Sequence, residues 1–203
     1  MAQLPHDDKK LVQIVDAALA EATRKSGAWL VCRPGCTQCC VGPFAISPLD
    51  TARLQHGLKQ LSRTDPQRAA RVRERARESI NRLKLHFPGD PQTGLLLDDA
   101  DSEAAFEEFA DDEVCPVLDP VSGTCDLYPW RPMTCRTFGP PVRSGPEHGL
   151  AVCELCYHGA TRQQIAACEM VPDPDNLEEK LLQQMAKSGA TTGNTIVAFA
   201  LKD

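Results

Sequence analysis

Apolar and polar residues follow a helical period in residues 8–26, with apolar positions three or four residues apart and charged side chains between them. Leu11, Val15 and Ala22 would share one face of such a helix. An amphipathic helix is therefore predicted here. It should end near Gly27, because glycine readily adopts the backbone conformation that terminates helices.

Two more helices are predicted from capping signals that are followed by the same period. Ser47-Pro48 supplies an N-cap hydroxyl and a proline at the first helical position, so a helix is expected from there to about Leu61. Asp65-Pro66 opens a third helix, whose apolar positions continue at spacings of three and four as far as Phe87.

The polar face of the third helix carries five arginines: Arg68, Arg71, Arg73, Arg75 and Arg77. A face of this kind can contact anions or nucleic acid, but a solvated face with intrahelical pairs to Glu74 and Glu78 is the simpler interpretation. Residues 98–113 carry nine acidic side chains. This acidic segment offers the arginines a partner within the same chain.

Residues 114–158 have a different character, because prolines recur from Pro116 to Pro141 and rule out long regular helices. Ordering such a loop-built segment costs roughly 1–2 kcal/mol of backbone entropy per residue. Its scattered apolar residues are few. We therefore expect something other than hydrophobic packing to hold this segment in place.

The C-terminal part is predicted to form short helices. Thr161-x-x-Gln164 has the pattern of a capping box, and Asp175-x-x-Glu178 opens a second helix that should stop near Gly189. Cys168 is in phase with Ile165, which favours burial as a small hydrophobic side chain. Residues 195–201 fit either an edge strand or a docked extension, and the pattern does not decide between them.

Composition places the chain among globular proteins of one domain. It has 203 residues, of which 42% are hydrophobic and 25% charged, and a net charge of −6, which argues against nucleic acid as a main partner. No apolar run approaches the roughly 20 residues that a membrane span needs. The first ten residues are polar and acidic where a signal peptide is basic and then apolar, so a cytoplasmic location is expected.

Ten cysteines change this picture, because four of them lie in the stretch Cys32-Arg-Pro-Gly-Cys36-Thr-Gln-Cys39-Cys40. Cytoplasmic thiols stay reduced, so clustered cysteines there bind metal more often than they form disulfides. Thiolates are soft ligands that suit zinc, copper(I) and iron–sulfur clusters. The stretch is therefore predicted to be part of a metal centre.

Two further motifs complete a recognisable pattern: Cys115-Pro-Val-Leu118, and Cys125-x-x-Tyr128-x-x-Arg131-Pro132-x-x-Cys135-Arg136-x-Phe138. Together with the first stretch, they resemble the YkgJ-type cysteine-cluster family, whose members carry a domain described as zinc- or iron-chelating and some of which are iron–sulfur proteins. The resemblance covers roughly half the chain. It implies metal chelation by Cys36, Cys39, Cys40, Cys115, Cys125 and Cys135, with Cys32 as the first position of the loop.

The pair Cys153-x-x-Cys156 lies past the best-matching region, and its assignment as a ligand pair rests on its spacing. Zinc takes four ligands, often as two close pairs, and this pair with two other cysteines would satisfy it. A 4Fe–4S iron–sulfur cluster also takes four cysteines, often a compact run plus one cysteine before a proline, such as Cys115-Pro116. Both metals stay open, and so does the number of sites.

An enzyme is the alternative function. Cys32-x3-Cys36-x2-Cys39 has the cluster spacing of radical enzymes that use S-adenosylmethionine, and the flagellin lysine methylases contain a related cysteine-cluster segment. A redox or S-adenosylmethionine-linked enzyme acting in protein methylation is therefore kept as the second hypothesis. Those enzymes fold into a barrel of alternating strands and helices, a pattern that is not evident in this chain.

These observations predict a mainly α-helical, cytoplasmic metal-binding protein, in which short helices pack around an irregular, loop-rich centre ligated by cysteine. A single domain is expected over residues 1–203, with the metal-binding core at 29–158 and a helical cover at 159–203. The loop from Cys32 to Cys40 should share its metal with the segment from Cys115 to Cys156. Arg131 and Arg136 are expected either to stabilise the thiolates by donating hydrogen bonds or to pair with Asp126 or the acidic segment.

Overall fold

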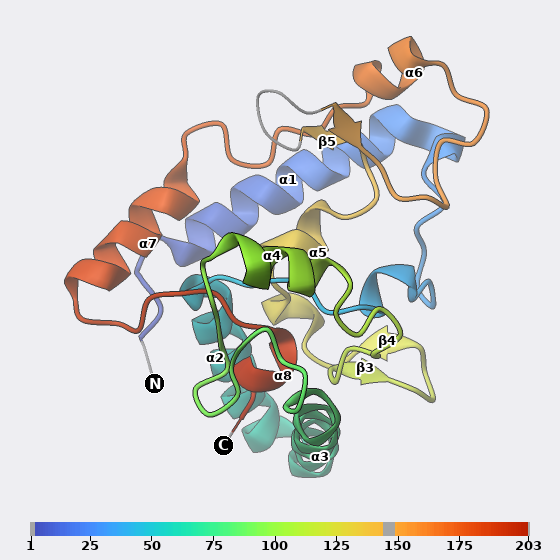
Figure 1. Cartoon of the computed structure of the whole chain (residues 1–203). Helices are drawn as coiled ribbons and strands as arrows, with labels where there is room; N and C mark the ends of the chain where they lie inside the picture. The colour runs from blue at the N-terminus through green and yellow to red at the C-terminus, as the bar shows by residue number, and fades with distance from the viewer. Residues whose placement is uncertain (1–2, 144–148, 203) are drawn as a thin grey trace. The chain divides into compact units, whose positions relative to one another are not determined.

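The computed structural model describes residues 3–143 and 149–202 and is mainly α-helical, as the sequence predicts (Figure 1). The chain divides into two compact units. Unit 1 consists of Pro34–Pro132 and Met185–Asp203 together with Met1–Leu4, and unit 2 consists of Pro5–Arg33 and Met133–Gln184. Among the described helices, none is both long and apolar enough to cross a membrane. The single-domain organisation stays a prediction.

Unit 1 is built on the helices α2 (Pro48–Thr64), α3 (Pro66–Leu83) and α8 (Val197–Ala200), which pack against one another. Both long helices begin where their caps predict. The Ser47 hydroxyl accepts a hydrogen bond from the Asp50 amide, and the Asp65 carboxylate accepts one from the Arg68 amide. The chain turns between the two helices within a single residue, because Asp65 ends α2 and caps α3.

The apolar stripes of these helices form the main core of unit 1, which includes Leu54, Leu58, Val72 and Leu127. A glycine in α2 permits one close contact. A Cβ atom placed on Gly57 would lie 2.4 Å from Cγ of Trp130, so the indole ring packs directly on the helix backbone. This contact fixes the short helix η3 (Tyr128–Trp130) against α2.

The remaining elements of unit 1 are short. The strands form two antiparallel two-stranded ribbons, in which Gly89 pairs with Leu96 and Leu118 pairs with Cys125. The elements in chain order are η2 (Gln38–Cys40), β1 (Gly89–Asp90), β2 (Leu95–Leu96), α4 (Ala100–Glu107), β3 (Leu118–Asp119) and β4 (Thr124–Cys125). The acidic segment thus contains a helix that its lack of apolar periodicity did not predict.

The C-terminal tail follows neither of the two expectations fully. Thr195 forms an isolated antiparallel bridge with Ile46, but the chain then turns into the single-turn helix α8 rather than continuing as a strand. Phe199 of α8 packs with Phe87 and Phe109 in a second cluster of buried residues. The tail is therefore an integral part of the core of unit 1.

Unit 2 contains α1 (Asp8–Ser26), which covers the predicted range and ends at Gly27. Its remaining elements are η1 (Gly27–Trp29), α5 (Met133–Thr137), β5 (Val142–Arg143), β6 (Leu150–Ala151), α6 (Arg162–Ala167) and the first part of α7 (Leu177–Lys187). Helix α5 packs against α1, where the buried Arg136 donates two hydrogen bonds to the Asp16 carboxylate at 2.7 and 2.9 Å. Helix α6 opens with the predicted capping box.

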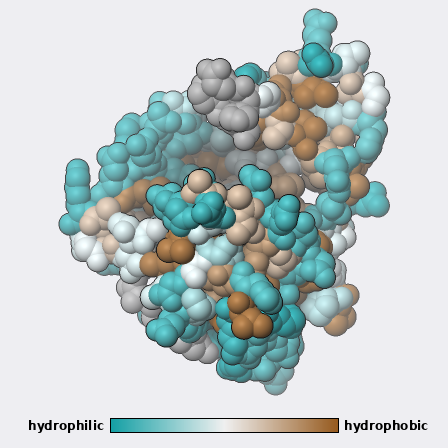
Figure 2. Space-filling model, in the orientation of Figure 1, coloured by the Kyte–Doolittle hydropathy of each residue, from teal (hydrophilic) through white to brown (hydrophobic). Residues whose placement is uncertain are grey.

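Arginines of α3 make three kinds of contact. Arg77 pairs with Glu74 within the helix, as a solvated face predicts, and hydrophilic residues dominate the surface over α3 in Figure 2. Arg82 reaches Glu113 at the end of the acidic segment, with Nη2 2.7 Å from Oε1. Arg68 and Arg75 instead point to a buried carboxylate beside the cysteines.

Candidate metal centre

A backbone pairing brings the cysteine loop to a segment seventy residues further along the chain. The Cys115 amide donates to the Cys40 carbonyl oxygen at 2.8 Å, and the Gly42 amide donates to the Glu113 carbonyl oxygen at 2.9 Å. Val41 and Val114 form an antiparallel bridge between these bonds. Cys39 and Cys40, which lie in η2, are thereby held beside Cys115.

Cys125 is brought to the same place by the ribbon of β3 and β4. Cys125 pairs with Leu118, and the Leu118 amide donates to the Cys115 carbonyl oxygen at 3.0 Å. The Asp126 amide also donates to the Val117 carbonyl oxygen at 2.8 Å. These hydrogen bonds and the ribbon of β3 and β4 thus hold Cys115 and Cys125 close together.

Cys36 lies close to this ribbon. A Cβ atom placed on Gly123, in the turn between β3 and β4, would lie 3.6 Å from the Gly35 Cα and 3.9 Å from the Thr37 Cγ2. The backbone on both sides of Cys36 therefore contacts the turn. Unit 1 gathers five of the nine predicted ligands: Cys36, Cys39, Cys40, Cys115 and Cys125.

The two adjacent cysteines have unlike thiols. A hydrogen bond from the Cys40 side chain lowers the pKa of Cys39 to about 6, against an opposing contribution from burial. The lowered pKa favours the thiolate of Cys39. A thiolate is the form in which cysteine binds a metal ion.

The pKa values of Cys115 and Cys125, in contrast to that of Cys39, are raised. Burial, with smaller contributions from the neighbouring Cys125 and Cys39, raises the pKa of Cys115 to about 12. Burial likewise raises the pKa of Cys125 to about 11. Nearby backbone amides act in the other direction: those of Val117 and Leu118 act to lower the pKa of Cys115, and that of Leu127 acts to lower the pKa of Cys125. Amides directed at sulfur stabilise a thiolate, so these positions are prepared for negative charge.

Two arginines of α3 anchor both of these cysteine segments through a single carboxylate. The Asp126 side chain is only 2% exposed and pairs with Arg68 and Arg75. Arg75 also donates through Nε to the Pro116 carbonyl oxygen at 2.8 Å. Arg75 therefore connects the residue after Cys115 to the residue after Cys125.

The two arginines beside Cys135 in the sequence have different roles. The guanidinium of Arg131 lies over the Tyr128 ring, 4.0 Å from its centre, and its positive charge acts to lower the pKa of Cys125. Arg131 also donates to the Tyr128 carbonyl oxygen at 3.0 Å, and its stabilisation of a thiolate through hydrogen bonds stays a prediction. Arg136 forms an ordinary ion pair, but its partner is Asp16 of α1 and not Asp126 or the acidic segment.

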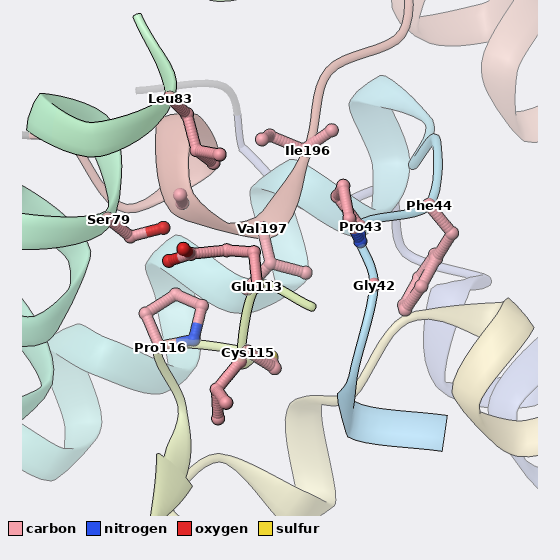
Figure 3. Close-up of a pocket in the computed structure, with 12 residues that line it drawn as sticks. Gly42, Pro43, Phe44, Ser79, Leu83, Glu113, Cys115, Pro116, Ile196 and Val197 are labelled. Atoms are coloured by element: carbon pink, nitrogen blue, oxygen red, sulfur yellow. The ribbon is translucent and has the colours of Figure 1, made fainter. Parts of the chain in front are cut away.

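A small cavity of about 20 Å³ lies behind Cys115 in unit 1. In Figure 3 the Ser79 hydroxyl points toward the Glu113 carboxylate at its rim. Partial burial acts to raise the pKa of Glu113, but the two hydrogen bonds that Arg82 donates to its carboxylate act in the other direction, and the pKa is lowered. The volume suffices for about one water molecule, so this cavity is too small for an organic substrate.

Unit 2 holds the other four predicted ligands. Cys32 is exposed, Cys135 lies half-buried on α5, and Cys153 and Cys156 are buried, at 8% and 5% exposure. The Cys156 amide donates to the Cys153 carbonyl oxygen at 2.9 Å, which closes a turn around this pair.

The donor chemistry fits a thiophilic metal. Cys39, Cys40, Cys115 and Cys125 supply four sulfurs, the number that zinc and iron–sulfur clusters take. As placed, however, no three cysteine, histidine or acidic side chains within residues 3–143 and 149–202 form a group that could hold a metal ion. The four cysteines lie in one part of unit 1, but their sulfur atoms are not placed around a common centre. The cysteine side chains would have to rotate to coordinate one metal ion.

Fold and sulfur arrangement together define a mainly α-helical protein with a cysteine-rich segment built from loops. The family model CxxCxxCC, described as "Putative zinc- or iron-chelating domain", matches residues 31–157. The chain belongs to this family, of which the YkgJ-type name is a narrower label. No curated protein and no solved structure matches the chain.

Sequence reasoning missed the arginine contacts with Asp126 and the position of Cys168. The spacing of seven residues between Arg68 and Arg75 places both on one face of α3, and Asp126 directly follows a cysteine. These signals were available. Cys168 is buried as expected, but it lies just past the end of α6 and in one cluster with Cys153 and Cys156, which its helical spacing did not indicate.

Proposed function

We propose that the protein is a cytoplasmic metal-binding protein that chelates zinc, or iron in an iron–sulfur cluster, through clustered cysteine thiolates. Cys39, Cys40, Cys115 and Cys125 are the proposed ligands in unit 1. Cys36, which lies against the same ribbon, is the alternative to one of them. The predicted ligands in unit 2 are Cys32, Cys135, Cys153 and Cys156.

The observation that carries this proposal is the gathering of the Cys39–Cys40 loop, Cys115 and Cys125 by direct backbone hydrogen bonds. Burial keeps the pKa values of Cys115 and Cys125 high, although nearby backbone amides act to lower them. A bound cation would supply the missing positive charge and favour their thiolates. Membership of a family described as zinc- or iron-chelating supports the same conclusion.

A metal would also solve the folding problem of the proline-rich segment. This segment forms only short elements between Cys115 and Cys135, so it has few internal hydrogen bonds with which to offset its ordering entropy. Structural zinc contributes roughly 10–16 kcal/mol to the folding of small zinc-binding modules. A contribution of that size would decide whether the segment is ordered.

The enzyme hypothesis stays a prediction that no observation favours. The strands in the described part of the chain are two residues long and form separate two-stranded ribbons, unlike the strands of a barrel. A metal-chelating function therefore accounts for the site with fewer assumptions.

Metal analysis of the full-length protein, purified without oxygen, tests the proposal. Stoichiometric zinc, or stoichiometric iron with acid-labile sulfide and a charge-transfer absorption, is the expected result. Cys115→Ser should lose this metal, whereas Thr124→Ser, a substitution beside Cys125 that leaves all thiols intact, should retain it. Purified protein that holds neither metal and takes up neither on reconstitution would overturn the proposal.

A further inference from the structure

Ser79 of α3 carries a buried hydroxyl that lines the small cavity behind Cys115 in unit 1. The residue is 1% exposed, and its hydroxyl oxygen has no hydrogen-bond partner among residues 3–143 and 149–202. Most buried polar groups in folded proteins are hydrogen-bonded to protein atoms or to an ordered water molecule. The Ser79 hydroxyl therefore needs a partner that the protein side chains do not supply.

Two other helical serines show how such a hydroxyl is usually satisfied. Ser26 of α1 and Ser62 of α2 each donate to the carbonyl oxygen four residues earlier, at 2.6 and 2.7 Å. A bond of this kind satisfies the hydroxyl within its own helix. The Ser79 hydroxyl does not form this bond, and in Figure 3 it points toward the Glu113 carboxylate.

Glu113 presents hydrogen-bond acceptors to the same cavity. Its side chain is 13% exposed, and its carboxylate oxygens accept hydrogen bonds from Arg82 at 2.7 and 3.1 Å. A carboxylate offers about four acceptor positions, so these two bonds do not saturate it. Ser79 is near enough to act on the charge of Glu113, but its hydroxyl forms no direct hydrogen bond with the carboxylate.

The cavity between these groups has the size of one water molecule. Its volume is about 20 Å³, and a cavity needs roughly 10–15 Å³ to hold a water molecule. Most of its lining is apolar, with Phe44, Leu83 and Val197 among the residues, and a wholly apolar cavity of this kind stays dry. Ser79 and Glu113 change this expectation, because they offer a water molecule one donor and one acceptor.

We propose that this cavity binds one structural water molecule, which accepts a hydrogen bond from the Ser79 hydroxyl and donates one to the Glu113 carboxylate. A bridging water is nearly as favourable in enthalpy as a direct hydrogen bond, and it satisfies the buried hydroxyl. A cation gains less here, because Arg82 already balances the charge of Glu113. The water site does not depend on whether the thiols hold a metal.

The water molecule would join α3 to the backbone pairing that holds the cysteine loop. The Glu113 carbonyl oxygen accepts from the Gly42 amide at 2.9 Å, beside the bond from the Cys115 amide to the Cys40 carbonyl oxygen. Arg82 already ties Glu113 to α3 at the surface. The water adds a buried link from the same helix, so Ser79 is a positioning residue for this pairing.

A crystal structure of the full-length protein tests the site directly. Electron density for one water molecule is expected at about 2.5–3.0 Å from both the Ser79 Oγ and a carboxylate oxygen of Glu113. An empty cavity would overturn the proposal, and so would a direct hydrogen bond between the two side chains.

Nuclear Overhauser effects from water test the same site in solution and need no variant. A long-lived water molecule in the cavity should give effects of the sign typical of bound water at the Val197 methyl groups, which line the cavity. Their absence in the folded, unsubstituted protein would contradict the proposal.

Ser79→Ala removes the donor and tests the role of the water in positioning. The effects at Val197 should weaken, and the Gly42 and Cys115 amides should exchange their hydrogens roughly fivefold faster, as expected for the loss of about one hydrogen bond. Thr64→Val is the matched control, because the Thr64 hydroxyl bonds within α2 and lies exposed. Ser79→Ala that resembles Thr64→Val in both measurements would show that Ser79 does not hold the water.

Discussion

Arg75 of α3 donates a hydrogen bond through Nη2 to the buried carboxylate of Asp126, at 2.5 Å. Through Nε the same guanidinium holds the Pro116 carbonyl oxygen at 2.8 Å. One side chain on a long, capped helix thus fixes two loop segments, each directly after a cysteine. The rigid part of unit 1 thereby positions Cys115 and Cys125.

Removing the carboxylate should destabilise unit 1 strongly. Asp126→Ala would leave Arg75 and Arg68 without their shared partner, and breaking a buried ion pair from one side costs about 3–5 kcal/mol. The expected loss is toward the lower end, because Arg68 is 36% exposed and water can solvate it. Urea unfolding of the metal-free protein measures this change.

Arg77→Ala is the matched control for that experiment. Arg77 and its partner Glu74 are 59% and 57% exposed on the same helix, so this substitution should change stability by less than about 1 kcal/mol. Arg75→Lys should fall between the two, since lysine keeps the charge but cannot offer the two nitrogens of the fork. Equal effects of Asp126→Ala and Arg77→Ala would show that the buried contact is unimportant.

Helices with long apolar stripes and caps could be predicted from the sequence, because their signals are local. α1, α2 and α3 begin at the predicted residues, and Asp65 and Ser47 act as the caps. Contacts between distant residues could not be predicted in the same way. The bridge between Val41 and Val114 depends on a loop closure that no local pattern records.

The candidate site also combines features that local sequence predicts with features that depend on contacts between distant residues. Its chemistry was evident, because soft ligands at close spacing indicate a metal whatever the fold. The grouping of Cys39 and Cys40 with Cys115 and Cys125 follows from backbone pairing, and the grouping of Cys168 follows from the exit of α6. The sequence therefore predicts that cysteines are the ligands, but it does not predict which cysteines lie together.

Gly57→Ala should destabilise unit 1 although alanine is the better helix former. The intrinsic preference would favour alanine by up to about 1 kcal/mol. The new methyl group, however, would lie 2.4–2.6 Å from three atoms of the Trp130 side chain, and overpacking of this kind typically costs about 1–3 kcal/mol. A net loss of stability is therefore expected in thermal or urea unfolding.

Trp130→Leu in the Gly57→Ala background separates the steric cause from others. The smaller side chain should relieve the collision, so the double variant should lose less than the sum of the two single losses. Strict additivity would mean that the clash with Trp130 is not the cause.

Thr161→Ala should loosen the end of α6 that carries Cys168. The Thr161 hydroxyl accepts from the Gln164 amide and the Gln164 side chain accepts from the Thr161 amide, and loss of such a cap costs about 1 kcal/mol. We expect faster alkylation of Cys168 in metal-free Thr161→Ala than in the unsubstituted protein. Thr161→Ser keeps the hydroxyl and should retain the slow rate; an accelerated rate in both variants would argue against the cap.

Metal removal should release the proline-rich segment while α3 stays folded. The backbone bonds that order residues 114–127 lie close to the cysteines, and the segment contributes Val117 and Leu127 to the apolar core. Helix α3 packs in the same core through Val72 and has its own helical hydrogen bonds in addition. Chelation should therefore increase hydrogen exchange in 114–127 much more than in α3, as measured by mass spectrometry. In Cys115→Ser, exchange in this segment should already be fast and should not respond to the chelator. An unchanged exchange pattern in metal-loaded protein after its metal is removed would show that the thiol centre does not stabilise the segment.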